Sequence, residues 1–213
     1  MKLESFSPDH IRTCYDAIRA TEPRPLIVGI TGEACAGKTY FSALLCGHFD
    51  TEVTANVYFS YDDFLISRAD RELLREKSYT EGPFAGRSHW EVLENWYRLD
   101  EFDSAIETLK AGKPFTFFPY QRSKGTVSSE AITLQPAPYI LVDTGMALEK
   151  MDFLILVSAD ADVILERKRQ RGVYRSWDEI VEIHERVQAF HWSRVKPLHA
   201  DIEITNNGHA TTT

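Results

Sequence analysis

Residues 32–39 of the sequence, GEACAGKT, could bind a chain of phosphates. They match the pattern GxxxxGK(S/T), known as Walker A, in which two glycines let the main chain turn so that its N–H groups face phosphate oxygens. Lys38 then reaches the β- and γ-phosphates, and the Thr39 hydroxyl ligates Mg²⁺. We therefore expect ATP and Mg²⁺ to bind here. The candidate nucleotide-binding residues are Gly32, Glu33, Ala34, Cys35, Ala36, Gly37, Lys38, Thr39 and Tyr40.

Two aspartates that follow apolar runs could complete a site for phosphoryl transfer. Such a site needs a carboxylate for the metal and a group that accepts the proton of the attacking hydroxyl. Asp143 ends the run YILV, where a Walker B acid is found, and Asp62 follows the run VYFS. Because the carboxyl ends of parallel strands open onto one edge of a sheet, we expect both carboxylates near the nucleotide. Asp63 is an alternative to Asp62 as the proton acceptor.

A basic run follows later in the chain. Residues 166–175, ERKRQRGVYR, contain five positive side chains and one negative, a local net charge of +4. Arg167 and Arg171 are four residues apart and share a helix face. Arginines that close over a transferring phosphoryl group stabilise its charge and exclude water, so we expect a small lid at residues 166–176. The other interpretation is a solvated basic helix face.

The elements that must position these residues alternate between strands and helices. Apolar runs predict strands over residues 26–31, 53–60, 139–142, 153–157 and 202–205. Helices are predicted over residues 10–20, 38–49, 69–77, 90–111 (broken near Asp100), 161–171 and 177–195. Prolines and aromatic residues between 113 and 138 indicate a lid, a hairpin or a substrate-facing excursion. The alternation predicts an α/β fold with a parallel sheet.

We expect the three-layer α/β/α architecture of P-loop NTPases, with a small lid. No linker is long enough to divide the chain, so residues 1–213 are predicted to form one kinase-like domain. Residues 1–25 are then an N-terminal helical extension.

Composition excludes several classes of protein. The 213 residues include 24 Lys and Arg against 32 Asp and Glu, a net charge of −8, which argues against a nucleic-acid binder. No apolar run approaches the roughly 20 residues of a membrane span, and the N-terminus is too polar for a signal peptide. The three cysteines lack metal-binding spacing and are expected to be reduced. These features predict a cytoplasmic protein without a nucleic-acid or membrane partner, and they leave homo-oligomerisation open.

In their order along the chain, these landmarks resemble the uridine kinase/phosphoribulokinase family of P-loop small-molecule kinases. The resemblance extends from Leu26 to about Asn207. It includes residues 32–39, which we call the phosphate loop. It also includes these segments: Asp62-Asp63-Phe64, Phe118-Pro119-Tyr120, Val142-Asp143-Thr144 and Ala200-Asp201-Ile202-Glu203-Ile204-Thr205-Asn206. The resemblance implies a small-molecule substrate.

The resemblance implies a role for each candidate residue. Asp62 is the general base, and Asp143 replaces the usual glutamate near the metal. Lys38 binds the β- and γ-phosphates, Thr39 binds Mg²⁺, and Arg167 and Arg171 in the lid steady the transferring phosphoryl group. The chain also departs from the pattern: Cys35 stands where many relatives have glycine. Because it lies at a helix N-terminus, we expect Cys35 to be the cysteine most readily oxidised.

The acceptor is not identified by these motifs. The segments that contact the nucleoside in uridine kinases are poorly matched by the stretches SHW and YQRSK. A nucleoside, a pantothenate-like acid, a sugar and a sugar phosphate all remain open, and Arg122 and Lys124 suit an anionic acceptor. The candidate acceptor residues are Asp62, His89, Trp90, Tyr120 and Arg122. His89 and Trp90 could equally be core residues. The alternative function is a regulatory nucleotide-binding protein or ATPase that has no metabolite acceptor.

Overall fold

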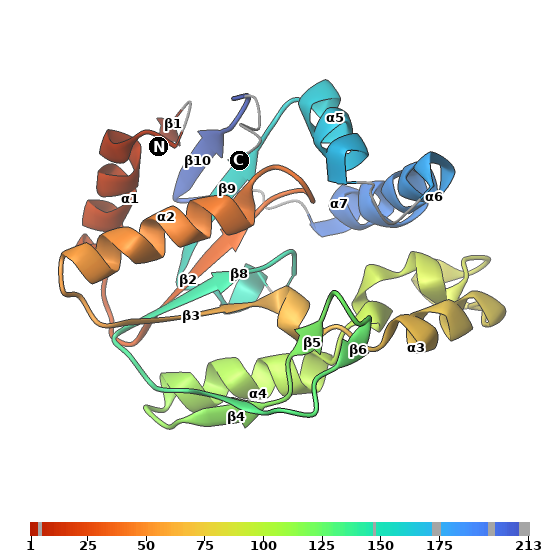
Figure 1. The fold of residues 1–213 in the computed structure, drawn as a ribbon, viewed down its shortest axis with the longest axis horizontal. Coiled ribbons are helices and arrows are strands. Elements are labelled where there is room, and N and C mark those ends of the chain that lie inside the picture. Colours follow the sequence, from red (N-terminus) through yellow and green to blue (C-terminus); the bar gives the residue numbers. More distant parts are fainter. Residues whose placement is uncertain (4–5, 147, 172–175, 196–198, 209–213) are drawn as a thin grey trace. The chain divides into compact units, whose positions relative to one another are not determined.

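The computed structural model describes residues 1–3, 6–146, 148–171, 176–195 and 199–208 (Figure 1). The chain divides into two compact units, which are described separately below. Unit 1 consists of Met1–Phe59, Ala137–Ile180 and Pro197–Thr213, and unit 2 consists of Ser60–Pro136 and Val181–Lys196.

Unit 1 is built on a six-stranded sheet in the order β1-β10-β9-β2-β8-β3. The strands are β1 (Lys2–Leu3), β2 (Leu26–Thr31), β3 (Asn56–Ser60), β8 (Tyr139–Asp143), β9 (Phe153–Ser158) and β10 (Ile202–Thr205). The pairs β1–β10, β10–β9, β9–β2 and β2–β8 are all parallel. Every residue of β2 is buried, as expected for a strand that is covered on both faces. The predicted parallel sheet is therefore confirmed, and β1 is a strand that the sequence did not predict.

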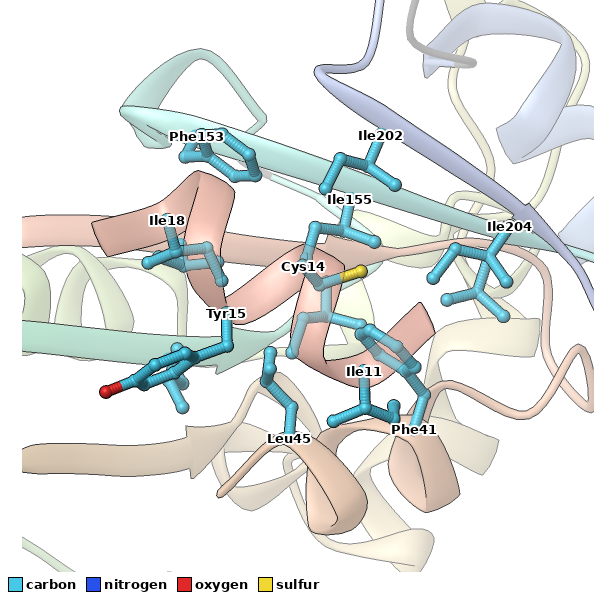
Figure 2. Packing of buried hydrophobic residues seen from close by; sticks show 14 of the residues in the cluster. Ile11, Cys14, Tyr15, Ile18, Phe41, Leu45, Phe153, Ile155, Ile202 and Ile204 are labelled. Atoms are coloured by element: carbon cyan, nitrogen blue, oxygen red, sulfur yellow. The ribbon is translucent and has the colours of Figure 1, made fainter. Parts of the chain in front are cut away.

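Two helices of unit 1 pack on one face of this sheet. They are α1 (Pro8–Ala20), which begins where the Ser7 hydroxyl accepts a 3.2 Å hydrogen bond from the amide of His10, and α2 (Lys38–Thr51). Figure 2 shows Cys14 and Ile18 of α1 packed among the aliphatic side chains of the sheet, including Ile155. This core supports the strand ends from which the phosphate loop and Asp143 project. The helix α5 (Ala161–Arg171) follows β9. The helix α6 (Trp177–Glu182) contains the point in the chain, after Ile180, where unit 1 ends and unit 2 resumes.

Unit 2 contains short helices and two antiparallel ribbons. Its helices are α3 (Arg68–Leu73), α4 (Leu99–Lys110) and α7 (Ala189–Val195), the last of which follows a π-helical turn at Ile183–Gln188. One ribbon pairs β4 (Phe115–Phe117) with β7 (Ile132–Leu134), and the other pairs β5 (Tyr120–Gln121) with β6 (Thr126–Val127). Of the lid, the hairpin and the substrate-facing excursion expected between residues 113 and 138, the ribbons match the hairpin. One buried cluster of this unit contains Leu65, Trp90, Trp96, Tyr120, Ile183 and Val187.

The helix predicted over residues 90–111 is wrong in its first half. That segment forms 3₁₀ turns at His89–Glu91 and Leu93–Trp96, and the helix α4 begins only at Leu99. A capping box between Ser88 and Glu91 starts the first turn, and the Trp96 indole donates a 2.8 Å hydrogen bond to the carbonyl of Trp90. Burial of the two indoles therefore outweighs local helix propensity. In the described part of the chain, no helix is both long and apolar enough to cross a membrane.

Candidate active site

The phosphate loop of unit 1 has a backbone that requires glycine at both ends. Gly32 directly follows β2 with φ +149°, and a Cβ atom there would lie 1.9 Å from the carbonyl oxygen of Val157. Gly37 precedes α2 with φ +109°, and a Cβ atom there would lie 2.5 Å from the side-chain nitrogen of Asn206. Cys35 between them also has a positive φ, of 73°. Such left-handed conformations turn successive amides toward a common centre, as an anion-binding loop needs.

Lys38, the first residue of α2, folds back over this loop. Its ammonium donates hydrogen bonds of 2.9 Å to the carbonyl of Gly32 and 3.2 Å to that of Glu33. The lysine charge is thus held at the loop itself, where the pattern predicts that it meets the β- and γ-phosphates.

Thr39 and Asp143, the two predicted metal ligands, are in direct contact. The Thr39 hydroxyl donates a 2.8 Å hydrogen bond to the carboxylate of Asp143. Asp143 is the last residue of β8 and lies opposite Ile30 of β2, and it is only 5% exposed. A hydroxyl and a carboxylate oxygen side by side are the hard donors that Mg²⁺ prefers when phosphates and water complete its shell. The residues present therefore fit the expected ion.

The side chain of Arg167 on α5 contacts main-chain carbonyls of the phosphate loop. Its guanidinium donates hydrogen bonds of 3.2 Å to the carbonyls of both Cys35 and Ala36. It also donates to the carbonyls of Asn206, at 3.0 Å, and Gly208, at 2.6 Å. Arg167 therefore ties the loop to the segment after β10. The sequence did not predict this bridging role, and contact of Arg167 with a phosphoryl group stays a prediction.

Lys168, the next residue on α5 and a member of the predicted basic run, is a buried lysine. It is 7% exposed, and this burial lowers the pKa of its ammonium. Glu33 nearby raises the pKa of Lys168 and Lys38 lowers it, so Lys168 lies near the loop. Its position in a basic run, next to an arginine that binds the loop, was the only available signal.

Unit 2 carries the predicted base in the turn that follows β3. The Ser60 hydroxyl accepts a 3.2 Å hydrogen bond from the amide of Asp62, and the Asp63 carboxylate accepts one of 3.1 Å from the amide of Ser60. This capping box uses Asp63 to hold the turn. The Asp62 carboxylate instead accepts hydrogen bonds from the Tyr97 hydroxyl, at 3.1 Å, and from the guanidinium of Arg122.

No protein-family profile matches the sequence. A uridine kinase from Streptococcus pneumoniae is 28% identical to it over 193 residues, which cover 85% of this chain and 82% of that protein. A solved structure described as a possible uridine kinase from Bacillus stearothermophilus shares the fold with a TM-score of 0.64 at 17% identity, over 92% of this chain and 97% of that one. The sequence is thus similar to that of uridine kinases over most of its length. A phosphoribulokinase from Rhodobacter spheroides has the same fold with a TM-score of 0.56 at 12% identity, over 79% of this chain and 64% of that one.

Three candidate acceptor residues of this chain have structural partners in unit 2. His89 stacks on Tyr79 with ring centroids 4.1 Å apart. Trp90 is 2% exposed within the buried cluster, and the Tyr120 hydroxyl is held by a 2.6 Å hydrogen bond from the guanidinium of Arg71. Burial leaves Trp90 little surface for a ligand. Contact of His89, Trp90 or Tyr120 with an acceptor stays a prediction.

Of the remaining candidates, one lies on a helix surface and the other at the end of a described segment. Tyr40 on α2 is 64% exposed, with its ring 6.1 Å from that of Phe6. Arg171 is the last residue of α5, and its side chain is outside the described part. Of the predicted lid at residues 166–176, residues 172–175 also lie outside the described residues.

Proposed function

We propose that the protein is an ATP-dependent kinase that transfers the γ-phosphate to a hydroxyl group of a small metabolite. The observation that carries the proposal is the hydrogen bond between Thr39 of the Walker A segment and Asp143 at the end of β8. A hydroxyl and an acid in contact beside a phosphate loop are the parts that P-loop enzymes use for a nucleotide and its metal. The homology to uridine kinases supports the same class of reaction.

In the proposed mechanism, the loop amides and Lys38 bind the phosphates. Thr39 and Asp143 would hold Mg²⁺, which neutralises phosphate charge when bound. The Asp62 carboxylate accepts the proton of the acceptor hydroxyl, and the freed oxygen forms a bond to the γ-phosphorus while the bond to the β–γ bridging oxygen breaks. The products are ADP and the phosphorylated acceptor. Arg167 keeps the loop in the shape that binds the phosphates.

Release of ADP with a panel of hydroxylated metabolites tests the proposal. We expect at least one nucleoside, sugar, sugar phosphate or hydroxy acid to stimulate ADP release, and substitution Asp62→Asn to abolish that stimulation while ATP still binds. Hydrolysis at the same rate with and without every acceptor would instead support the regulatory ATPase and reject the kinase.

A further inference from the structure

Both carboxylate oxygens of the proposed base are engaged in this structure. Tyr97 donates to Oδ1 of Asp62, at 3.1 Å, and Arg122 donates to Oδ2. Each carboxylate oxygen can accept a second hydrogen bond, but the guanidinium on Oδ2 favours the ionised form of Asp62, so proton transfer from an acceptor hydroxyl is easier once Arg122 has left. Tyr97 is anchored because its ring packs on Tyr61 with centroids 4.1 Å apart. The side chain of Arg122 is 67% exposed, so Arg122 is the donor that can leave.

The turn that carries Arg122 is rich in positive charge. Residues 119–129, PYQRSKGTVSS, contain Arg122 and Lys124 and no carboxylate. Arg68 lies against the same turn: its amide donates a 2.8 Å hydrogen bond to the carbonyl of Gly125, and its guanidinium atoms would lie 3.3 Å from a Cβ atom at Gly125. The turn thus carries two cationic residues and has a third, Arg68, against it, and Arg122 reaches the base.

We infer that the acceptor is an anion, in which a carboxylate or phosphate group lies a few bonds from the reacting hydroxyl. The anionic group binds Arg122 and draws it from Asp62, whose oxygen is then free to accept the hydroxyl proton. A guanidinium forms strong paired hydrogen bonds with either kind of anion, so the substrate competes with Asp62 for the same donor group. A neutral acceptor leaves Arg122 on Asp62. This inference rests on the proposed kinase function and narrows its acceptor class.

Matched pairs of anionic and neutral probes test the inference by calorimetric binding. The pairs are D-glycerate and glycerol, D-ribose 5-phosphate and D-ribose, and pantothenate and panthenol, and comparison of the pairs distinguishes carboxylate from phosphate. We expect at least one anionic probe to bind about tenfold or more tightly than its neutral partner. The substitution Arg122→Gln should reduce this preference to less than about threefold, whereas Arg122→Lys should keep part of it. The substitution Lys113→Gln removes an exposed cation of the same unit and should leave the preference unchanged.

The variant Asp62→Asn gives a readout that a structural role of Arg122 would not. Because it removes the charge that competes for Arg122, it should bind the anionic probe as tightly as the unsubstituted protein or more tightly. The inference is overturned if no anionic probe binds better than its neutral partner, if Arg122→Gln keeps the preference, or if Asp62→Asn weakens anion binding as much as Arg122→Gln does.

ADP release with the same probes separates this inference from the proposed function. If neutral and anionic partners stimulate release equally, the kinase function stands and the inference fails. If an anionic probe binds through Arg122 and no probe stimulates release, the anion site stands and the kinase function fails.

Discussion

The hydroxyl of Thr39 donates a 2.8 Å hydrogen bond to the carboxylate of Asp143, 104 residues later in the chain. This hydrogen bond joins the start of α2 to the end of β8 within unit 1. Removal of the hydroxyl in Thr39→Val should raise the Mg²⁺ concentration needed for half-maximal activity by about tenfold or more, because one oxygen donor is lost. Thr39→Ser keeps the hydroxyl and serves as control. Titration of activity with Mg²⁺ at saturating ATP measures the effect, and equal curves for the two variants would contradict it.

Substitution of Asp62 should lower kcat, whereas substitution of Asp63 should lower the unfolding free energy. Asp62→Asn removes the proposed proton acceptor and should lower kcat by about a hundredfold or more. Asp63→Ala removes the carboxylate that caps the turn at Ser60 and should cost about 1 kcal/mol of unfolding free energy, with kcat changed less than about threefold. Initial rates and urea unfolding of both variants measure the two effects. If Asp63→Ala loses more kcat than Asp62→Asn, then Asp63 is the proton acceptor and the assignment is wrong.

Arg167 should be important for the stability of the phosphate loop. Arg167→Met leaves the four carbonyls at Cys35, Ala36, Asn206 and Gly208 without their charged donor, so we expect a loss of about 2 kcal/mol in unfolding free energy. The KM for ATP should rise as well, because the loop loses its support. Arg169→Met on the same helix is the matched control, since that side chain is 73% exposed and should change stability by less than about 0.5 kcal/mol. Urea denaturation compares the two variants, and equal losses would reject the bridging role.

Lys168 should produce a characteristic dependence of stability on pH. Burial lowers its pKa in the folded protein below the ordinary value of 10.5, so the unfolded chain binds its proton more readily. Stability therefore rises as the pH increases through the folded pKa toward the unfolded one. Lys168→Met removes this rise, and the difference in unfolding free energy between the two proteins should shift in favour of the unsubstituted protein as the pH increases from 7 to 10. Lys2→Met, at a side chain 85% exposed, should show no such shift.

Cys35 should react with alkylating reagents faster than the other two cysteines. Burial raises the pKa of Cys14 to about 12 and that of Cys46 to about 11, so at pH 8 only about one thiol in ten thousand and about one in a thousand are ionised. Mass spectrometry of alkylated peptides measures the three rates, and ATP should slow the reaction of Cys35 because that residue lies in the loop. Alkylation of Cys46 at the rate of Cys35, or the absence of protection by ATP, would contradict this prediction.

The sequence by itself determined the strand, the turn and the helix that carry the Walker A pattern in unit 1. The strand, the loop and the helix over residues 26–51 follow from an apolar run, two glycines and a Lys-Thr pair that are contiguous in the chain. The position of Asp143 at the end of a strand could be predicted for the same reason, because it follows an apolar run. These signals are local: each depends on residue types within a few positions.

Only the tertiary structure decided what several of these residues contact. Asp63 is used by its turn and Asp62 meets Arg122, which is 60 residues away in the chain. Arg167 reaches loop carbonyls 131 and 132 residues away, and the burial of Trp90 replaces half of a predicted helix by turns. Such pairings depend on which distant segments pack together, and burial can outweigh the roughly 1 kcal/mol or less per residue of helix propensity. No pattern of neighbouring residues encodes that choice.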